Sequence, residues 1–394
     1  MESQTLVRNG GTTGIWRQLP GEAGLRLDRE SCLPFRYRTE GCSACADACP
    51  RGAISLLPGD LAVSAECVGC GRCMAACPMG ALDHPGFEPG RETAGAHARP
   101  LPVECKRIPV SQRTAGAVVV PCLGGIEAAW LMERQRPGGG VRLMDRGLCQ
   151  GCSAGGGEVH PVSRALDHAR DLLETMGIPL SHLPSLERDE LPAESPAGEP
   201  VPPAGGTNLS RRAFFGRLAR TAEVAVFRSP QSGEPAGGTR LARGPKSSRA
   251  RWRLLAASMS LARTSGLPVP HGLFVQATIT QDCCARGLCA AVCPTGALEI
   301  LETEGAEARV FKALDCIACG ACASACPEQA LRIDECHDES WRQPRELVRI
   351  VRKTCVDCGC EFADAGGRHV QCEACRKSRD LVKDVYQQLF SRNA

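Results

Sequence analysis

The stretch Cys67-Val-Gly-Cys70-Gly-Arg-Cys73-Met-Ala-Ala-Cys77-Pro78 contains four cysteines separated by two, two and three residues, and it ends in proline. Cys316-Ile-Ala-Cys319-Gly-Ala-Cys322-Ala-Ser-Ala-Cys326-Pro327 repeats this spacing. Thiolates two residues apart on a tight loop can reach different irons of one cube, and runs of this form bind [4Fe–4S] clusters. Both runs therefore predict cubane ligands, with disulfides or zinc as the alternatives.

Two further runs depart from this spacing. One has Thr39 where its leading cysteine belongs, and Cys32 is the nearest substitute. Its other cysteines are Cys42, Cys45 and Cys49, the last followed by Pro50. In the other run Arg286 stands at the second ligand position, and Cys284 is the available replacement. Its other cysteines are Cys283, Cys289 and Cys293, the last followed by Pro294.

Residues 30–85 and 272–336 resemble the bacterial-type 2[4Fe–4S] ferredoxin domain, in which the fourth cysteine of each run binds the neighbouring cluster. The resemblance covers about a third of the chain. In the first module it implies one cluster on Cys42, Cys45, Cys77 and Cys32, and another on Cys67, Cys70, Cys73 and Cys49. In the second module it implies a full cluster on Cys316, Cys319, Cys322 and Cys293. The last cluster would take Cys283, Cys289, Cys326 and either Cys284 or Cys336, and that site could instead be [3Fe–4S] or open.

The C-terminal segment reads Cys355-x2-Cys358 and then Cys372-x2-Cys375, with Cys360 as a spare thiol. Two such knuckles present four thiolates tetrahedrally to Zn²⁺, so we expect a zinc ribbon here. A further cluster and unmetallated thiols are the alternatives. Residues 341–394 hold 11 basic and seven acidic residues, which favours contact with protein over nucleic acid.

The middle of the chain contains Cys105, Cys122, Cys149 and Cys152. Strands expected at 117–120 and 141–144, with helices at 126–135 and 161–176, indicate a small α/β domain. The Pro-Cys122-Leu-Gly-Gly and Cys149-Gln-Gly-Cys152 motifs resemble the small cysteine-containing subunit of methyl-viologen-reducing hydrogenases. That resemblance implies electron transfer between a hydrogenase and a heterodisulfide reductase. Four thiols suffice for one more cluster, while zinc and buried unligated cysteines remain the alternatives.

Cysteine usage points to a reducing compartment. The chain of 394 residues has 26 cysteines and only 4% aromatic residues, so metal–thiolate bonds should supply part of the folding energy. Residues 1–30 lack the apolar run of a signal peptide, and no stretch approaches the ~20 apolar residues of a membrane span. We therefore expect a cytoplasmic protein whose clustered thiols bind metal.

Charge is unevenly distributed. The formal net charge is +3, yet residues 201–263 contain 12 basic and two acidic residues. A helix at 210–227, capped by Ser210, would place basic side chains beside apolar ones. This basic middle suits an acidic partner subunit or peripheral contact with an anionic membrane, and a solvated linker is the alternative.

Catalytic motifs are lacking in the sequence. The triple glycines at 138–140 and 155–157 lack the Lys and Ser/Thr of a phosphate loop, and no G-x-G-x-x-G follows a strand. His160 and His168 are expected to be solvated helix residues.

Together these patterns predict an α+β protein with two ferredoxin-like modules, here called module 1 (30–95) and module 2 (272–336). The expected order is an N-terminal extension (1–29), module 1, the small α/β domain (100–183), a basic Pro/Gly-rich linker with helical segments (184–271), module 2, and a zinc ribbon with a helix (341–394). The expected function is non-catalytic electron transfer through about four [4Fe–4S] clusters, with one zinc. The redox partner would be hydrogenase-, formate dehydrogenase- or reductase-like, and no nucleic acid is expected. The alternative is an assembly or maturation factor for a metallo-redox enzyme.

Overall fold

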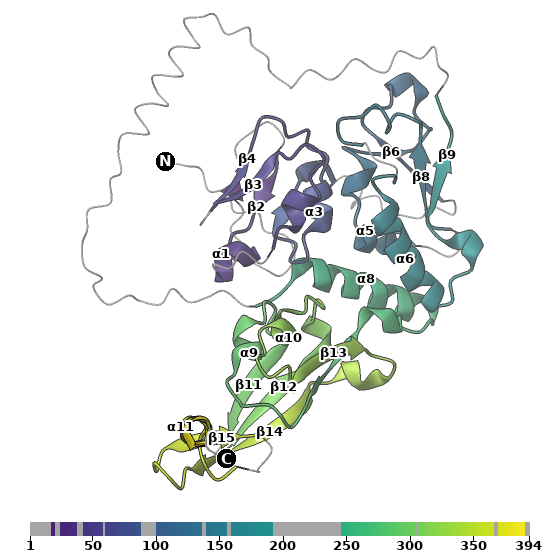
Figure 1. Ribbon diagram of the computed structural model, residues 1–394. Coiled ribbons are helices and arrows are strands. Elements are labelled where there is room, and N and C mark those ends of the chain that lie inside the picture. The colour runs from purple at the N-terminus through teal and green to yellow at the C-terminus, as the bar shows by residue number, and fades with distance from the viewer. Residues whose placement is uncertain are drawn as a thin grey trace, which may run out of the picture.

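The computed structural model describes residues 17–19, 24–37, 42–57, 60–87, 100–135, 139–155, 159–191, 246–303, 306–365 and 369–390. These residues combine short helices with small sheets, so the fold is α+β. Thr39 and the helix expected at 210–227 lie outside them. Figure 1 shows the N-terminal and middle parts on one side of a long helix, α8, and the C-terminal part on the other.

Module 1 is built from two antiparallel sheets and short helices. β1 (Arg17–Gln18) and β2 (Arg26–Leu27) belong to the expected N-terminal extension, and β2 pairs with β5 (Leu82–Asp83). The hairpin comprises β3 (Ile54–Leu57) and β4 (Asp60–Val63). The helical segments are α1 (Leu33–Tyr37), α2 (Ala44–Asp47), α3 (Arg72–Ala76) and the 3-10 turn η1 (Pro85–Phe87). The strands are thus short, and the cysteine loops lie between them and the helices.

The middle of the chain contains a four-stranded parallel sheet in the order β7-β6-β8-β9. Its strands are β6 (Leu101–Cys105), β7 (Val118–Val120), β8 (Val141–Asp145) and β9 (Ser185–Arg188). Valine-rich runs such as β7 suit buried parallel strands. The helices are α5 (Ala128–Glu133) and α6 (Ser163–Thr175), which contact each other, with 3-10 turns η2 (Val110–Gln112), η3 (Leu123–Gly125) and η4 (Leu180–His182). β6 lies between β7 and β8 in the sheet. The chain runs from β6 to its neighbour β7 on one side and then crosses to β8 on the other side, so the strand order reverses beside β6.

Helix α8 (Arg249–Ser265) contacts three parts of the molecule. The Ser248 side chain accepts a hydrogen bond from the Arg251 backbone N–H at its start, and Gly266, with φ of 66°, ends the helix. Arg253 pairs with Glu127 and Glu133 beside α5. α8 thereby links the middle sheet to both modules, as Figure 1 shows.

Module 2 and the C-terminal segment share a sheet. The four-stranded antiparallel sheet runs β11 (Leu298–Thr303), β12 (Ala306–Phe311), β14 (Arg345–Thr354) and β15 (Glu361–Asp364). β10 (Val275–Ile279) pairs separately with β13 (Leu331–Glu335). The helical segments are α9 (Leu288–Val292), α10 (Ala321–Ser324), η5 (His271–Leu273), η6 (Ala313–Asp315), η7 (Glu339–Arg342) and the terminal α11 (Glu373–Phe390). The expected ribbon is therefore continuous with the hairpin of module 2.

The span expected to be a linker with helical segments contains two ordered elements of the fold, one strand and one helix. Residues 185–188 form β9, which pairs with β8, and residues 249–265 form α8. Both are drawn into the structure by long-range contacts, which a local Pro/Gly/Ser count does not register. No described helix is long and apolar enough to cross a membrane.

Candidate iron–sulfur and metal centres

Three cysteine loops share one backbone conformation. The residues before and after the second ligand position have positive φ: 65° and 74° at Gly69 and Gly71, 53° and 71° at Ala318 and Gly320, and 59° and 73° at Ala285 and Gly287. Turns that alternate in this way direct successive backbone N–H groups into a concavity that favours anions. The loops are thus shaped to surround sulfur atoms that carry negative charge.

The segment after three of the four Cys-Pro pairs also repeats. The backbone N–H groups of Ala53, Ala81 and Ala330 donate to the sulfurs of Cys49, Cys77 and Cys326 at 3.3, 3.3 and 3.4 Å. The residue before each alanine has positive φ: Gly52 (58°), Gly80 (64°) and Gln329 (51°). The pairs Gly52-Ala53, Gly80-Ala81 and Gln329-Ala330 therefore form the turn that directs an N–H group at sulfur.

In module 1 the structure brings cysteines from separate runs together. Burial raises the pKa of Cys32 to about 12, and the nearby thiols of Cys77 and Cys45 raise it further. Burial likewise raises the pKa of Cys70, which has Cys49 and Cys67 among its neighbours. Thiols that each disfavour ionisation of the next can all be thiolates only if positive charge is added among them, as metal binding does.

The regular site of module 2 has the same character. Burial raises the pKa of Cys316 to about 11, and Cys293 and Cys319 raise it further. Burial raises the pKa of Cys322 to about 12, and the nearby thiols of Cys293 and Cys316 contribute to that rise. Cys319 is the exposed member of this set, so this site comes nearest to solvent.

The irregular site of module 2 contains three grouped thiols. Burial raises the pKa of Cys289, and the thiols of Cys283 and Cys326 are close enough to contribute. The Cys284 sulfur instead interacts with the Asp282 carbonyl oxygen at 3.6 Å, and the charges nearest to it are those of Glu328, Glu373 and Arg286.

Cys336 lies away from that group. In the β10–β13 ladder Ile279 pairs with Leu331 at the end beside the irregular site, and Val275 pairs with Glu335 at the other end. These five pairs span about 13 Å at about 3.3 Å per residue. Cys336 follows Glu335 and interacts with Asp338 and Ser340, so the structure does not bring it to Cys283, Cys289 or Cys326.

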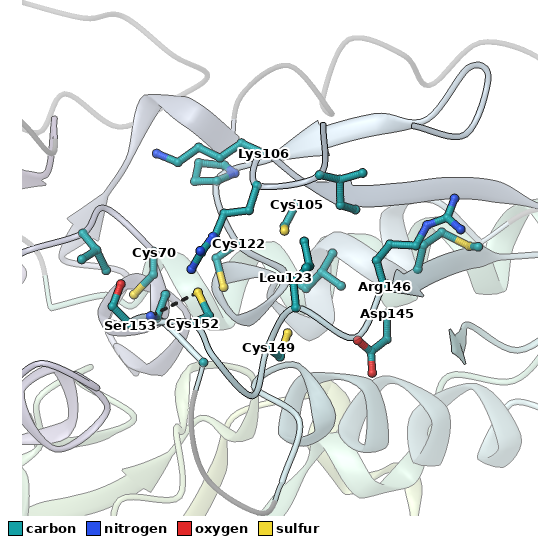
Figure 2. Close-up of a pocket in the computed structure, with 18 residues that line it drawn as sticks. Cys70, Cys105, Lys106, Cys122, Leu123, Asp145, Arg146, Cys149, Cys152 and Ser153 are labelled. Atoms are coloured by element: carbon teal, nitrogen blue, oxygen red, sulfur yellow. Dashed lines mark hydrogen bonds between the residues drawn. The ribbon is translucent and has the colours of Figure 1, made fainter. Parts of the chain in front are cut away.

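The four middle cysteines converge at the carboxyl end of the parallel sheet. Cys105 ends β6, Cys122 follows β7, and Cys149 and Cys152 follow β8. Figure 2 shows their sulfurs around a shared space, with Cys70 of module 1 beside them. They line a cavity of about 80 Å³. Ligands of parallel sheets commonly bind at this edge where the strand order reverses.

Electrostatics distinguish the thiols of this cavity. Burial raises the pKa of Cys122 to about 12, with contributions from Cys70, Cys105 and Cys149. For Cys152 burial acts in the same direction, but hydrogen bonds from the Ala154 backbone and the Arg107 side chain outweigh it and lower the pKa. The cavity thus combines one thiol whose pKa is lowered with others whose pKa burial raises.

His160 differs from its expected role. It precedes α6 instead of lying on it, is half-buried, and its Nε2 lies 3.4 Å from the Cys149 sulfur. Asp145, Cys149 and His160 bring their potential ligand atoms within 4.8 Å of one another. His168, in contrast, is an exposed residue of α6, as expected.

The C-terminal cysteines form a compact group of four. The sulfurs of Cys355, Cys358, Cys372 and Cys375 all lie within 4.8 Å of one another, and those of Cys358 and Cys372 are 3.7 Å apart. A tetrahedron of ~2.3 Å Zn–S bonds has edges of about 3.8 Å, which this separation fits. A hydrogen bond from the Cys372 backbone lowers the pKa of Cys355 to about 6. Cys360 is exposed, and its sulfur faces the Cys358 carbonyl oxygen at 3.9 Å.

Two known families match parts of the chain. The 4Fe-4S dicluster domain family matches residues 38–81, and the 4Fe-4S binding domain family matches residues 310–332. No curated protein matches the chain. The matches confirm ferredoxin-type 4Fe–4S domains in both halves of the sequence, and with them iron–sulfur and metal binding. An iron–sulfur role in electron transfer follows from these domains.

Several contacts of these sites were not predicted from the sequence. Arg107 contacts Cys152, Cys70 reaches the middle cavity, and the side chain of Arg309 is buried beside Cys283 and Cys289. Arg107 lies two residues after Cys105, which is a local signal. The other two contacts depend on segments far apart in the chain.

Proposed function

We propose that this chain relays single electrons to or from a partner oxidoreductase through about four [4Fe–4S] clusters. Two would be held in module 1 and two in module 2, on the cysteine sets inferred from the ferredoxin resemblance. The observation that supports this most is the repeated loop backbone, around which thiols from separate runs meet. Burial of the sulfurs and N–H donors aimed at them are the features by which a protein sets cluster potential.

The contact between module 1 and the middle sheet supports a continuous relay. A Cβ on Gly125, three residues after Cys122, would lie 2.7 Å from the Cys70 carbonyl oxygen. Arg72 donates to the Ala154 carbonyl oxygen at 3.3 Å. Because Cys70 and Cys122 line the same cavity, a cluster on the four middle cysteines would lie directly beside a cluster of module 1. We therefore include a fifth cluster in the proposal.

The C-terminal four-thiol group is proposed to hold a structural zinc ion. The four sulfurs lying within 4.8 Å of one another support this, and the ribbon would then stabilise the far edge of the module 2 sheet. Its metal would act on folding and not on electron transfer, since zinc has no redox chemistry in proteins.

The partner is proposed to be a redox protein. The basic residues 201–263 of this chain would contact an acidic surface of that partner or an anionic membrane. Some of these basic side chains form ion pairs and hydrogen bonds within the molecule. Arg249 pairs with Asp28, Arg251 donates to the Leu314 carbonyl oxygen, and Arg253 pairs with two glutamates. The remaining basic residues would be those that dock. The many reduced thiols that clusters require suit the cytoplasm, which we propose as the compartment.

Metal content of anaerobically purified full-length protein tests this function. Four cubanes and one ribbon predict about 16 Fe, matching sulfide and one Zn per chain, and a fifth cubane raises iron to about 20. Electron paramagnetic resonance (EPR) of the reduced protein should show magnetically interacting cubanes. The clusters should remain bound through repeated oxidation and reduction. Eight Fe or fewer would contradict the two-module assignment. Clusters that pass intact to an apo-acceptor would instead support the assembly-factor alternative.

A further inference from the structure

The loop 283–289 keeps the cluster-binding backbone although it lacks one ligand. Ala285 and Gly287 have φ of 59° and 73°, close to the values at Ala318 and Gly320 in the regular loop. A non-glycine residue with positive φ is disfavoured and persists where its surroundings hold it. The loop therefore retains the shape that surrounds a cluster, even with Arg286 at the second ligand position.

Arg286 does not point its charge at the thiols. Its guanidinium lies 3.0 Å from Glu328 and 2.6 Å from Glu373, the first residue of α11. The Arg286 side chain is 38% exposed and that of Glu373 35% exposed, so this corner is reached from solvent. Neither Cys284 nor Cys336 fills the corner, because one faces Asp282 and Glu328 and the other lies at the far end of the β10–β13 ladder.

A buried arginine lies on the inner side of the same site. The Arg309 side chain is 1% exposed, pairs with Glu307 at 3.0 Å and donates to the carbonyl oxygen of Ala285 at 3.0 Å. Its Nε is buried and has no hydrogen-bond partner among the described residues. The Arg309 guanidinium is close enough to Cys283 and Cys289 for its positive charge to act on their sulfurs. Arg309 thus both holds the loop at Ala285 and places a buried positive charge near the thiols.

We propose that this site holds a cluster on three thiolates only, Cys283, Cys289 and Cys326, whose fourth corner takes an external thiolate. The proposal rests on the proposed function, since it requires that module 2 binds iron–sulfur clusters. Three thiolates leave the cluster one charge more positive than four, so an anionic ligand is favoured at the corner. The Glu328 carboxylate, whose Oε2 lies 3.9 Å from the Cys326 sulfur, is paired with Arg286. Thiolate is the preferred ligand of iron in such clusters. Arg309 is a positioning residue that raises the reduction potential of this one cluster.

The first experiment adds 2-mercaptoethanol to the anaerobic, reduced full-length protein and follows the EPR spectrum. The wild-type protein should show a change in one cluster signal, while Arg286→Cys, which supplies a fourth thiolate, should show none. Cys319→Arg makes the matching change in the regular loop and should create a second responsive signal. A wild-type protein that holds all its clusters but does not respond would overturn the proposal. Absence of clusters from module 2 would instead contradict the proposed function.

The second experiment measures the potential of the same signal by EPR-monitored redox titration. Arg309→Gln should lower the reduction potential of this cluster and leave the potentials of the other clusters unchanged. Arg309→Lys keeps the positive charge, so its potential should stay close to that of the wild-type protein. Arg352→Gln is the matched control, because Arg352 binds the same Glu307 at 2.9 Å but is 47% exposed. An equal potential in wild-type and Arg309→Gln protein would overturn the role of Arg309. If Arg309→Gln does not fold, the potentials of Arg309→Lys and Arg352→Gln are compared instead. An equal lowering of the cluster potential in these two variants would count against the proposal.

Discussion

The Ser248 hydroxyl donates a hydrogen bond of 2.7 Å to the carbonyl oxygen of Pro78, which lies 170 residues earlier in the chain. The Ser248 hydroxyl oxygen also accepts a hydrogen bond from the Arg251 backbone N–H and so caps α8. Next to it, the Arg249 backbone N–H binds the Met79 carbonyl oxygen at 3.1 Å. The start of α8 is therefore attached to the Cys-Pro turn that ends a cluster run, and cluster binding in module 1 is mechanically connected to the helix.

Ser248→Ala should destabilise the α8 junction. The loss of an N-cap costs about 1 kcal/mol. The loss of the hydrogen bond to the half-buried Pro78 adds about 1 kcal/mol. Faster amide hydrogen exchange in α8 and a lower thermal midpoint under anaerobic conditions would report this. Ser260→Ala, at an exposed position of the same helix, is the control and should have little effect. Equal exchange rates in the two variants would show that the Ser248 contacts are unimportant.

Arg253→Gln should weaken the attachment of α8 to α5. The Arg253 side chain is 21% exposed and binds both carboxylate oxygens of Glu133, at 2.7 and 2.8 Å, as well as Glu127. Charged hydrogen bonds of this kind contribute about 1.5–3 kcal/mol. The comparison variant is Arg342→Gln, whose pair with Glu339 is more than half exposed and should contribute little to stability. Limited proteolysis and denaturant unfolding measure both, and the assignment fails if Arg342→Gln is the more damaging change.

Zinc retention should depend on Cys358 and not on Cys360. The Cys358 sulfur belongs to the group of four, whereas Cys360 lies outside it. Cys358→Ser should remove most of the one zinc per chain, because serine is a poor ligand for Zn²⁺ at neutral pH. Cys360→Ser should keep it, and iron content should be the same in both. Zinc measured by plasma mass spectrometry decides between them, and equal zinc in the two variants would contradict the ligand set.

Cys149→Ser should lower iron content through the middle cavity. A cubane there accounts for about four Fe per chain, so the variant should lose about that number and keep the signals of both modules. The control is Cys336→Ser, a buried cysteine outside every thiol group, whose Asp338 and Ser340 neighbours accommodate a hydroxyl. If both variants retain all iron, the middle cavity does not bind a cluster.

Several features were readable from the sequence because they depend on neighbouring residues. The spacing from Cys67 to Pro78 and from Cys316 to Pro327 predicts cubane ligands, and the family matches confirm 4Fe–4S domains there. Local geometry also explains why the spacing is informative: the ligands lie on one short loop whose turns are set by residues such as Gly71 and Gly320. The same holds for the two knuckles at the C-terminus, which the structure brings within 4.8 Å.

Only the tertiary structure decided what lies beside those loops. Parallel pairing of β6, β7 and β8 gathers the middle cysteines at one edge, and close packing at Gly125 brings Cys70 to them. The β10–β13 register separates Cys336 from the irregular site, and the fold buries Arg309 against Ala285. Such contacts join residues that are tens of positions apart in the chain. They are set by strand register and close packing, which no spacing within a single run encodes.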